Sequence, residues 1–69
     1  MSNTYKCVTV VGTSSNGIED AIQSAVGSAA GSLRNLGWFE VQEMRGRIDN
    51  GKVTEYQVKV QIGFRVERD

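Results

Sequence analysis

Residues 53–66 alternate regularly between apolar and polar side chains. A β-strand points successive side chains to opposite faces, so this alternation predicts a long strand. The two sets are Thr54, Tyr56, Val58, Val60, Ile62, Phe64 and Val66, and Glu55, Gln57, Lys59, Gln61, Gly63 and Arg65. One face of the strand is therefore expected to join a hydrophobic core, and the other to form a polar surface.

An Asn-Gly pair predicts a tight turn just before this strand. Asn50 and Gly51 suit the positive φ angles of a type I′ turn. The turn joins residues 38–48 to residues 53–66, which makes these two segments an antiparallel hairpin.

The hairpin predicts the face on which Trp38 lies. Counting outward from a two-residue loop pairs Phe39 with Ile62 on the core face and Trp38 with Gly63 on the polar face. Three interpretations of this tryptophan remain open: it covers the bare backbone at Gly63, it anchors a subunit interface, or it stacks on a planar ligand.

Two further elements precede the hairpin. Residues 4–11 are rich in β-branched and aromatic side chains, which predicts a strand. A helix follows from Ile18, with Asn16 as its N-cap, Glu19 as the reciprocal carboxylate and Gly37 as the stop. Its apolar stripe is Ile18, Ile22, Val26, Ala29, Leu33 and Leu36, and its small residues are Ser24, Gly27, Ser28, Gly31 and Ser32. The small residues predict a close approach by a curled sheet or by another subunit.

The order β-α-β-β predicts an α+β fold in which residues 1–69 form a single domain. If the helix runs back along the first strand, the third strand lies in the middle of a three-stranded antiparallel sheet, in the order 1-3-2, wrapped around one helix. A chain this short buries a marginal core. Cys7 is the lone cysteine and there is no histidine, so neither a disulfide nor a zinc site is expected to support the fold. Assembly with further copies is the remaining support.

Arginines cluster near the hairpin and the C-terminus. The same register places Arg45 and Arg47 on the core side, beyond the end of the helix. With Arg65 they are candidates for binding an anion such as phosphate, which a guanidinium meets with two parallel hydrogen bonds. The alternative is ordinary ion pairing with Glu43, Glu55 or Glu67.

Composition argues against several classes of protein. Eight basic and eight acidic residues cancel, so no net field steers the chain to nucleic acid or an anionic membrane. No apolar run approaches the roughly 20 residues of a membrane span, and the N-terminus lacks a signal-peptide core, so a cytoplasmic protein is predicted. With no histidine, and with Cys7 expected as an inert buried thiol, the chain is not expected to be an enzyme.

Three runs carry a resemblance that covers nearly the whole chain. They are VGTSSNGIEDAI, LGWFEVQEMRGRI and YQVKVQIGF, with the Asn-Gly turn between the last two. They closely resemble the dodecins, small flavin-binding proteins with a β-α-β-β fold that assemble as hollow dodecamers. The resemblance implies a homo-dodecamer that stores flavin and quenches its photochemistry by electron transfer, with no substrate turned over.

The resemblance also implies roles for five residues. Trp38 would stack on the flavin ring, two protomers holding a pair of flavins between their indoles, and Gln57 would hydrogen-bond the polar edges of the ring. Arg45 and Arg65 would grip the phosphate of FMN, and Arg47 makes the chain similar to bacterial members. FMN is the expected ligand, ahead of FAD and riboflavin.

The predicted register separates two of these residues. Gly63, the partner of Trp38, is six positions from Gln57, which is roughly 20 Å at about 3.3 Å per residue. A flavin that meets both side chains would therefore need neighbouring chains. Two other functions remain open: a flavin-dependent oxidoreductase, and an oligomer that binds coenzyme A or another nucleotide at a separate site.

Overall fold

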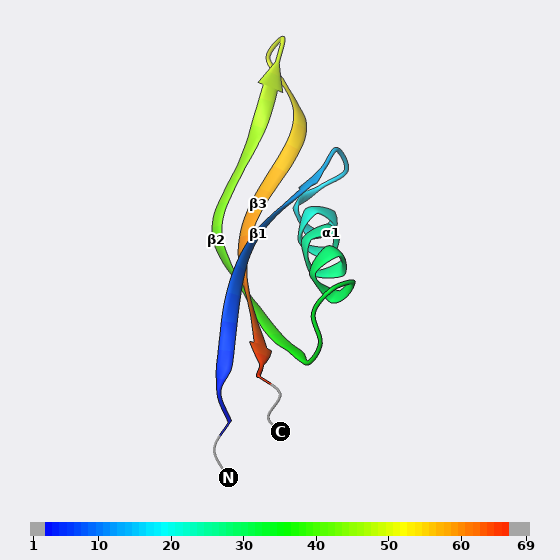
Figure 1. The fold of residues 1–69 in the computed structure, drawn as a ribbon. Coiled ribbons are helices and arrows are strands. Elements are labelled where there is room, and N and C mark those ends of the chain that lie inside the picture. The colour runs from blue at the N-terminus through cyan, green and yellow to red at the C-terminus, as the bar shows by residue number, and fades with distance from the viewer. Residues whose placement is uncertain (1–2, 67–69) are drawn as a thin grey trace.

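The computed structural model describes residues 3–66, and four elements follow one another along them in the predicted order (Figure 1). They are β1 (Tyr5–Ser14), α1 (Ile18–Ala30), β2 (Leu36–Asp49) and β3 (Lys52–Arg65). The strands form an antiparallel sheet in the order β1-β3-β2. The predicted fold class and strand order are therefore confirmed, and β1 and β2 extend beyond their predicted ends.

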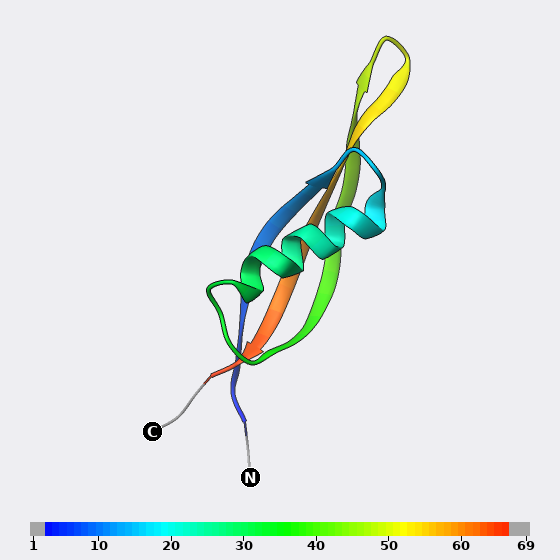
Figure 2. The ribbon, with the colours of Figure 1, turned by 90° about the vertical axis from the view of Figure 1, so that its right-hand side faces the viewer.

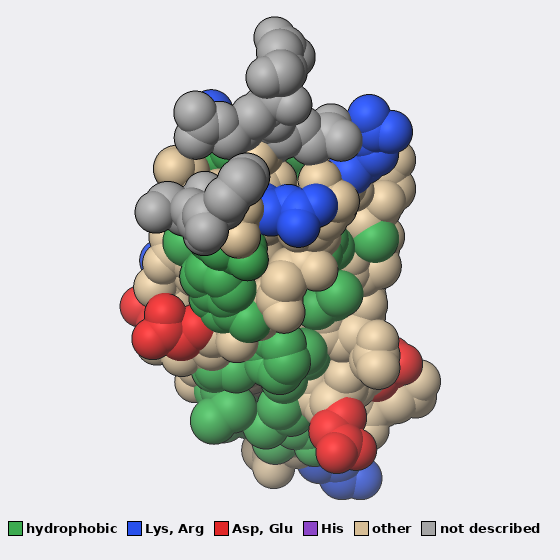
Figure 3. Space-filling model, turned by 90° about the horizontal axis from the view of Figure 1, so that it is seen from below, with side chains coloured by type: hydrophobic (Ala, Val, Ile, Leu, Met, Phe, Trp, Pro, Cys, Tyr) green, Lys and Arg blue, Asp and Glu red, His purple; other side chains and the backbone are tan. Residues whose placement is uncertain are grey.

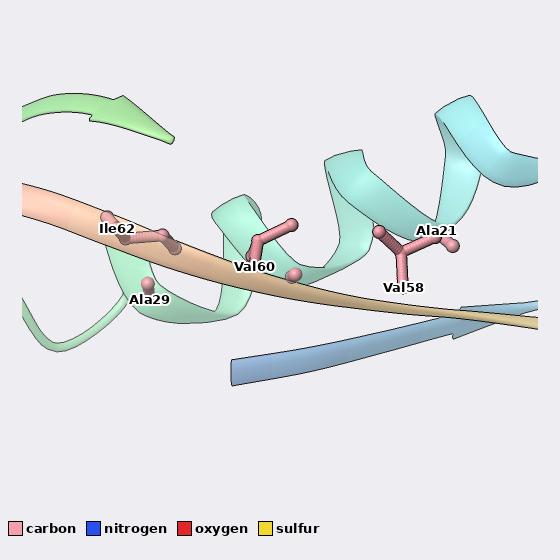
Figure 4. Packing of buried hydrophobic residues seen from close by; sticks show 6 residues of the cluster. Ala21, Ala29, Val58, Val60 and Ile62 are labelled. Atoms are coloured by element: carbon pink, nitrogen blue, oxygen red, sulfur yellow. The ribbon is translucent and has the colours of Figure 1, made fainter. Parts of the chain in front are cut away.

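The helix α1 packs across one face of the sheet, mainly over β1 and β3 (Figure 2). The buried core joins helix alanines to the inward side chains of β3 (Figure 4): Ala21, Ala25, Ala29, Val58, Val60 and Ile62. Residues four apart lie on one side of a helix, so the alanines form a flat strip that lets the helix approach the strand closely. The predicted core face of β3 is confirmed at its centre.

The predicted apolar stripe of the helix is only partly right. Ile22 and Val26 pack at the margin of the core, and alanines occupy its centre. The helix ends at Ala30, and Leu36 and Gly37 belong to β2. Larger side chains facing β3 would hold the helix away from the sheet, so small residues occupy the closest contact.

Ser14 organises the start of the helix in place of Asn16. The backbone N–H groups of Asn16 and Gly17 donate to Ser14 Oγ over 2.9 and 3.4 Å, and the Ser14 hydroxyl donates to Asp20 Oδ2 over 2.7 Å. The N-cap is Gly17, which makes no side-chain capping bond. The predicted cap of Asn16 with Glu19 is therefore wrong, because a buried serine at the end of β1 holds the turn.

Gly12 allows β1 and α1 to touch. A Cβ at this position would overlap the carbonyl oxygen of Ala21 and would lie 2.9 Å from the Cβ of Ala25. In contrast, nothing lies within 4 Å of a Cβ built at Gly27. The close approach predicted at the small residues of the helix occurs in this chain between a strand glycine and helix alanines.

The hairpin of β2 and β3 extends beyond the helix as an arm (Figures 1 and 2). At its tip, Asn50 and Gly51 have φ angles of 52° and 74°, which confirms the predicted turn chemistry. On the arm, Ile48 is 69% exposed and Val53 56%, and Met44, which pairs with the buried Val58 beside the helix, is 59% exposed.

The helix leaves the inner face of β2 largely uncovered. Phe39 and Val41 point to the core side, as predicted, but they remain 49% and 38% exposed because α1 hardly contacts β2. Hydrophobic side chains also form a continuous area on the end of the molecule opposite the turn (Figure 3). An apolar surface of this kind typically marks an interaction site.

Cys7 departs from its predicted burial. Its side chain is exposed, and its partner across β1 and β3 is Gly63, on the sheet face away from the helix. The expectation of a buried thiol is therefore wrong, because Cys7 lies on the sheet face that α1 does not cover, whereas its inertness stays a prediction. Within residues 3–66, no helix is long and apolar enough to cross a membrane.

Gly12→Ala is expected to destabilise the fold, because its methyl group meets helix backbone that moves aside only if α1 lifts from the sheet. Overpacking of this kind costs about 1–3 kcal/mol. Gly27→Ala is the matched control, since its methyl group has open space and alanine favours a helix by about 1 kcal/mol. Chemical denaturation followed by far-UV circular dichroism gives the free energy of unfolding of both variants.

An unchanged unfolding midpoint for Gly12→Ala would contradict the close packing of β1 on α1. A lower free energy of unfolding for Gly27→Ala would indicate that another copy of the chain packs against that side of the helix.

Candidate functional site

Trp38 lies on the outer face of the sheet, opposite Gly63, as the hairpin register predicts. A Cβ at Gly63 would overlap the Cζ2 and Cε2 atoms of the indole, so the ring lies directly over the glycine backbone. The first interpretation of Trp38, as a cover for Gly63, is therefore confirmed. The indole is still 47% exposed, which leaves a large aromatic surface available on a polar face.

Tyr5 of β1 packs beside this indole. The two ring centroids are 5.0 Å apart and the planes are tilted by 51°, which lies within the range of favourable aromatic pairs. Tyr5 is paired with Arg65 across β1 and β3. The sequence shows Tyr5 in a predicted strand, but its place beside Trp38 follows only from the register between β1 and β3, which the hairpin count does not provide.

Two register shifts in the hairpin change the face on which the arginines lie. The pairing departs from the predicted register between Arg47 and Ile48 and returns to it between Val41 and Glu43, so that Arg45 pairs with Gln57 and Arg47 with Glu55. A shift of one residue reverses the face of the side chains beyond it, and a second shift restores it. Arg45 and Arg47 therefore lie on the outer face, and their predicted position on the core side is wrong.

The register between these two shifts brings Arg45 and Gln57 into contact. Arg45 Nε donates to Gln57 Oε1 over 2.9 Å, and Gln57 Nε2 donates to Glu55 Oε1 over 2.9 Å. These bonds define which end of the amide is oxygen and which is nitrogen. A primary amide has two donor hydrogens and two acceptor lone pairs, so one of each remains for a further partner.

A shallow hollow of about 140 Å³ adjoins these side chains on the outer face. It is lined by Val11, Glu43, Arg45, Gln57 and Lys59. Glu43 pairs with Lys59 across β2 and β3. Two cationic side chains, one carboxylate and an amide therefore surround a partly apolar floor. This set of groups suits a polar ligand with some negative charge.

The predicted site residues fall at two ends of the outer face. The arm end carries Arg45, Arg47 and Gln57, and the other end carries Trp38 and Arg65. Gln57 is six positions along β3 from Gly63, the partner of Trp38, which is roughly 20 Å. One chain therefore does not bring Trp38 and Gln57 together. Glu67, one of the ion-pairing alternatives, lies outside the described residues.

Comparisons with known proteins agree on one family. The family model described as Dodecin matches residues 4–67. A dodecin of Thermus thermophilus is 52% identical over 67 residues, covering 97% of each chain. The structure of a dodecin from Streptomyces coelicolor is 45% identical with a TM-score of 0.92, covering 97% of this chain and 96% of that one. A dodecin from Streptomyces davaonensis is 38% identical with a TM-score of 0.94, covering 99% and 100%.

Proposed function

Because the chain belongs to the dodecin family, whose members are small flavin-binding proteins and not enzymes, we propose that it stores and sequesters FMN. The observation that carries the proposal is the indole of Trp38, which lies over Gly63 and is 47% exposed on an otherwise polar face. A fully packed tryptophan would leave no surface on which a ligand could stack. A half-exposed one offers a planar surface on which a flat aromatic ring can stack.

Trp38 would act by stacking and by electron donation. A bound flavin supplies a light-absorbing ring that readily accepts an electron. Trp38 would hold an electron-rich indole against that ring, where it would serve as an electron donor through which absorbed light energy could be lost as heat. This role supports photoprotection together with storage, and it requires no acid or base. It is therefore compatible with a site that contains no histidine.

Gln57 and Arg45 would recognise the polar parts of the ligand. The free donor and acceptor of the Gln57 amide suit the carbonyl and N–H groups at the edge of the ring, and Arg45 holds that amide from one side. Arg45, Arg47 and Arg65 supply positive charge near either end of the outer face. FMN is the flavin that we propose, because it carries a phosphate group, absent from riboflavin, that suits a guanidinium.

The ligand site would be completed by assembly of the chain into a homo-oligomer. Trp38 and Gln57 are too far apart to meet one flavin within a chain. The exposed inner face of β2 and the apolar residues of the arm give further copies a surface to cover, and β1 and β2 have free edges. We propose a hollow dodecamer, with flavin pairs held between the indoles of two copies.

Trp38→Ala is expected to weaken FMN binding about 5- to 150-fold, because stacking of an aromatic base on a side chain contributes about 1–3 kcal/mol. It should also abolish most of the quenching of FMN fluorescence. Titration of FMN into the purified oligomer measures both quantities. Trp38→Phe is the matched control, since it keeps a ring for stacking but is a poorer electron donor. Equal quenching by wild type and Trp38→Ala would refute the stacking role.

Met44→Glu is expected to prevent assembly, because it places a charge on an apolar surface that other copies would bury. Ser15→Glu, in the exposed loop before α1, is the control. Light scattering should give wild type a mass many times the 7.6 kDa of one chain, and Met44→Glu a lower mass. A wild-type protein that remains a monomer would contradict the proposed assembly. FMN titration of the same samples then shows whether binding requires it.

Arg45→Ala and Arg65→Ala are expected to weaken FMN binding about 10- to 100-fold, since a hydrogen bond to a charged group contributes about 1.5–3 kcal/mol. Riboflavin lacks the phosphate, so its binding should change less. Lys52→Ala, at the tip of the arm, is the control. Calorimetric titration with both ligands makes the comparison, and equal losses for FMN and riboflavin would mean that these arginines do not recognise the phosphate.

A further inference from the structure

The contact between Trp38 and Tyr5 connects two strands that are not neighbours in the sheet. Trp38 belongs to β2 and Tyr5 to β1, and β3 lies between these strands. A side chain on β3 would normally separate rings on its two sides. At this row of the sheet the residue of β3 is Gly63, and the indole occupies the space that a Cβ would take. The absence of that side chain allows the two rings to meet.

The rings restrict one another, although each is also exposed to solvent. Tyr5 is 45% exposed and Trp38 is 47% exposed. Gly63 forms the floor beneath the indole, and Tyr5 meets it from the β1 side at a tilt of 51°. A Cβ at Gly37 would lie 3.6 Å from Cε2 of Tyr5, so this ring also packs against the backbone of β2. Rotation of the indole away from the sheet would break the aromatic contact.

We propose that Tyr5 is a positioning residue that holds the Trp38 indole flat over Gly63 before any ligand arrives. An exposed tryptophan otherwise samples several rotamers, and ordering it on binding lowers affinity. The Tyr5 ring reduces this loss by restricting the indole in the free protein. This inference rests on the proposed function for its effect on flavin, whereas the ordering of the indole is independent of any ligand.

The contact is made by the ring of Tyr5, so the phenol hydroxyl is not required. Tyr5→Phe keeps the ring and Tyr5→Ala removes it, and the pair therefore separates ring packing from any action of the hydroxyl group. Thr9→Ala is the matched control, because Thr9 is an exposed residue of β1 two rows further along the same face, opposite Gln61.

The test measures the near-UV circular dichroism of the ligand-free protein, in the indole bands, and then the affinity for FMN. Tyr5→Ala should lose most of the indole signal and bind FMN about two- to tenfold more weakly, the range expected for one aromatic pair. Tyr5→Phe and Thr9→Ala should match wild type in both measurements. In Gly63→Ala, the added methyl group displaces the indole while Tyr5 is unchanged. This variant should therefore also lose the indole signal.

Three results would overturn the proposal: an unchanged indole signal in Tyr5→Ala, equal losses in Tyr5→Phe and Tyr5→Ala, or a lost signal with unchanged FMN affinity. If Tyr5→Ala does not fold, Tyr5→Leu replaces it, because leucine keeps an apolar side chain without an aromatic ring. The indole signal and the FMN affinity of Tyr5→Leu then test the proposal. If wild type binds no FMN, the proposed function fails, and the circular dichroism alone still decides whether Tyr5 orders Trp38.

Discussion

Because β3 is hydrogen-bonded to β1 along one edge and to β2 along the other, its two faces position both the core and the candidate site. The inward side chains Val58, Val60 and Ile62 are fully buried beneath the helix. The outward positions include Gly63 under the Trp38 indole and Gln57 beside Arg45. The period of two along one strand thus separates the residues that stabilise the chain from those that are available for binding.

The helix covers the sheet unevenly, and this unevenness links the fold to assembly. Alanines and Gly12 let α1 lie close to β1 and β3. A thirteen-residue helix placed there does not reach across to β2 or along the arm, so Phe39, Val41 and Met44 keep large exposed fractions. A small chain with a core built largely from alanine and valine has limited burial of its own. Contacts with further copies would cover the same surface and complete the proposed flavin site.

Two glycines in the strands allow contacts that a side chain at the same position would prevent. Gly12 allows the helix to approach β1, and Gly63 allows an indole on β2 to meet a tyrosine on β1. Either glycine looks like a weak point in a strand when the sequence is considered alone, because glycine packs nothing and costs conformational entropy. In the folded chain, each leaves a space that another element fills.

Much of the fold could be predicted from local patterns. The alternation along residues 53–66, the Asn50-Gly51 turn and the helical spacing after Ile18 gave the element order, the sheet order and the outward position of Trp38. Each of these features depends on residues close to one another in the chain, or on counting from a turn of known length. The resemblance of three runs to the dodecins added the family and the expected roles of the site residues.

The rest was decided by the tertiary structure. Two register shifts, one between Arg47 and Ile48 and one between Val41 and Glu43, moved Arg45 and Arg47 to the outer face and placed Arg45 against Gln57. Such irregularities have no signature in an otherwise regular strand, and each reverses the face of the side chains beyond it. The contact of Tyr5 with Trp38 depends on the register between β1 and β3, which are distant in sequence. The sequence by itself thus determined the elements, the two faces of β3 and the faces of Trp38, Phe39 and Val41. Only the tertiary structure decided the faces of Arg45 and Arg47 and which side chains meet, because register shifts and pairing between distant strands leave no local pattern in the sequence.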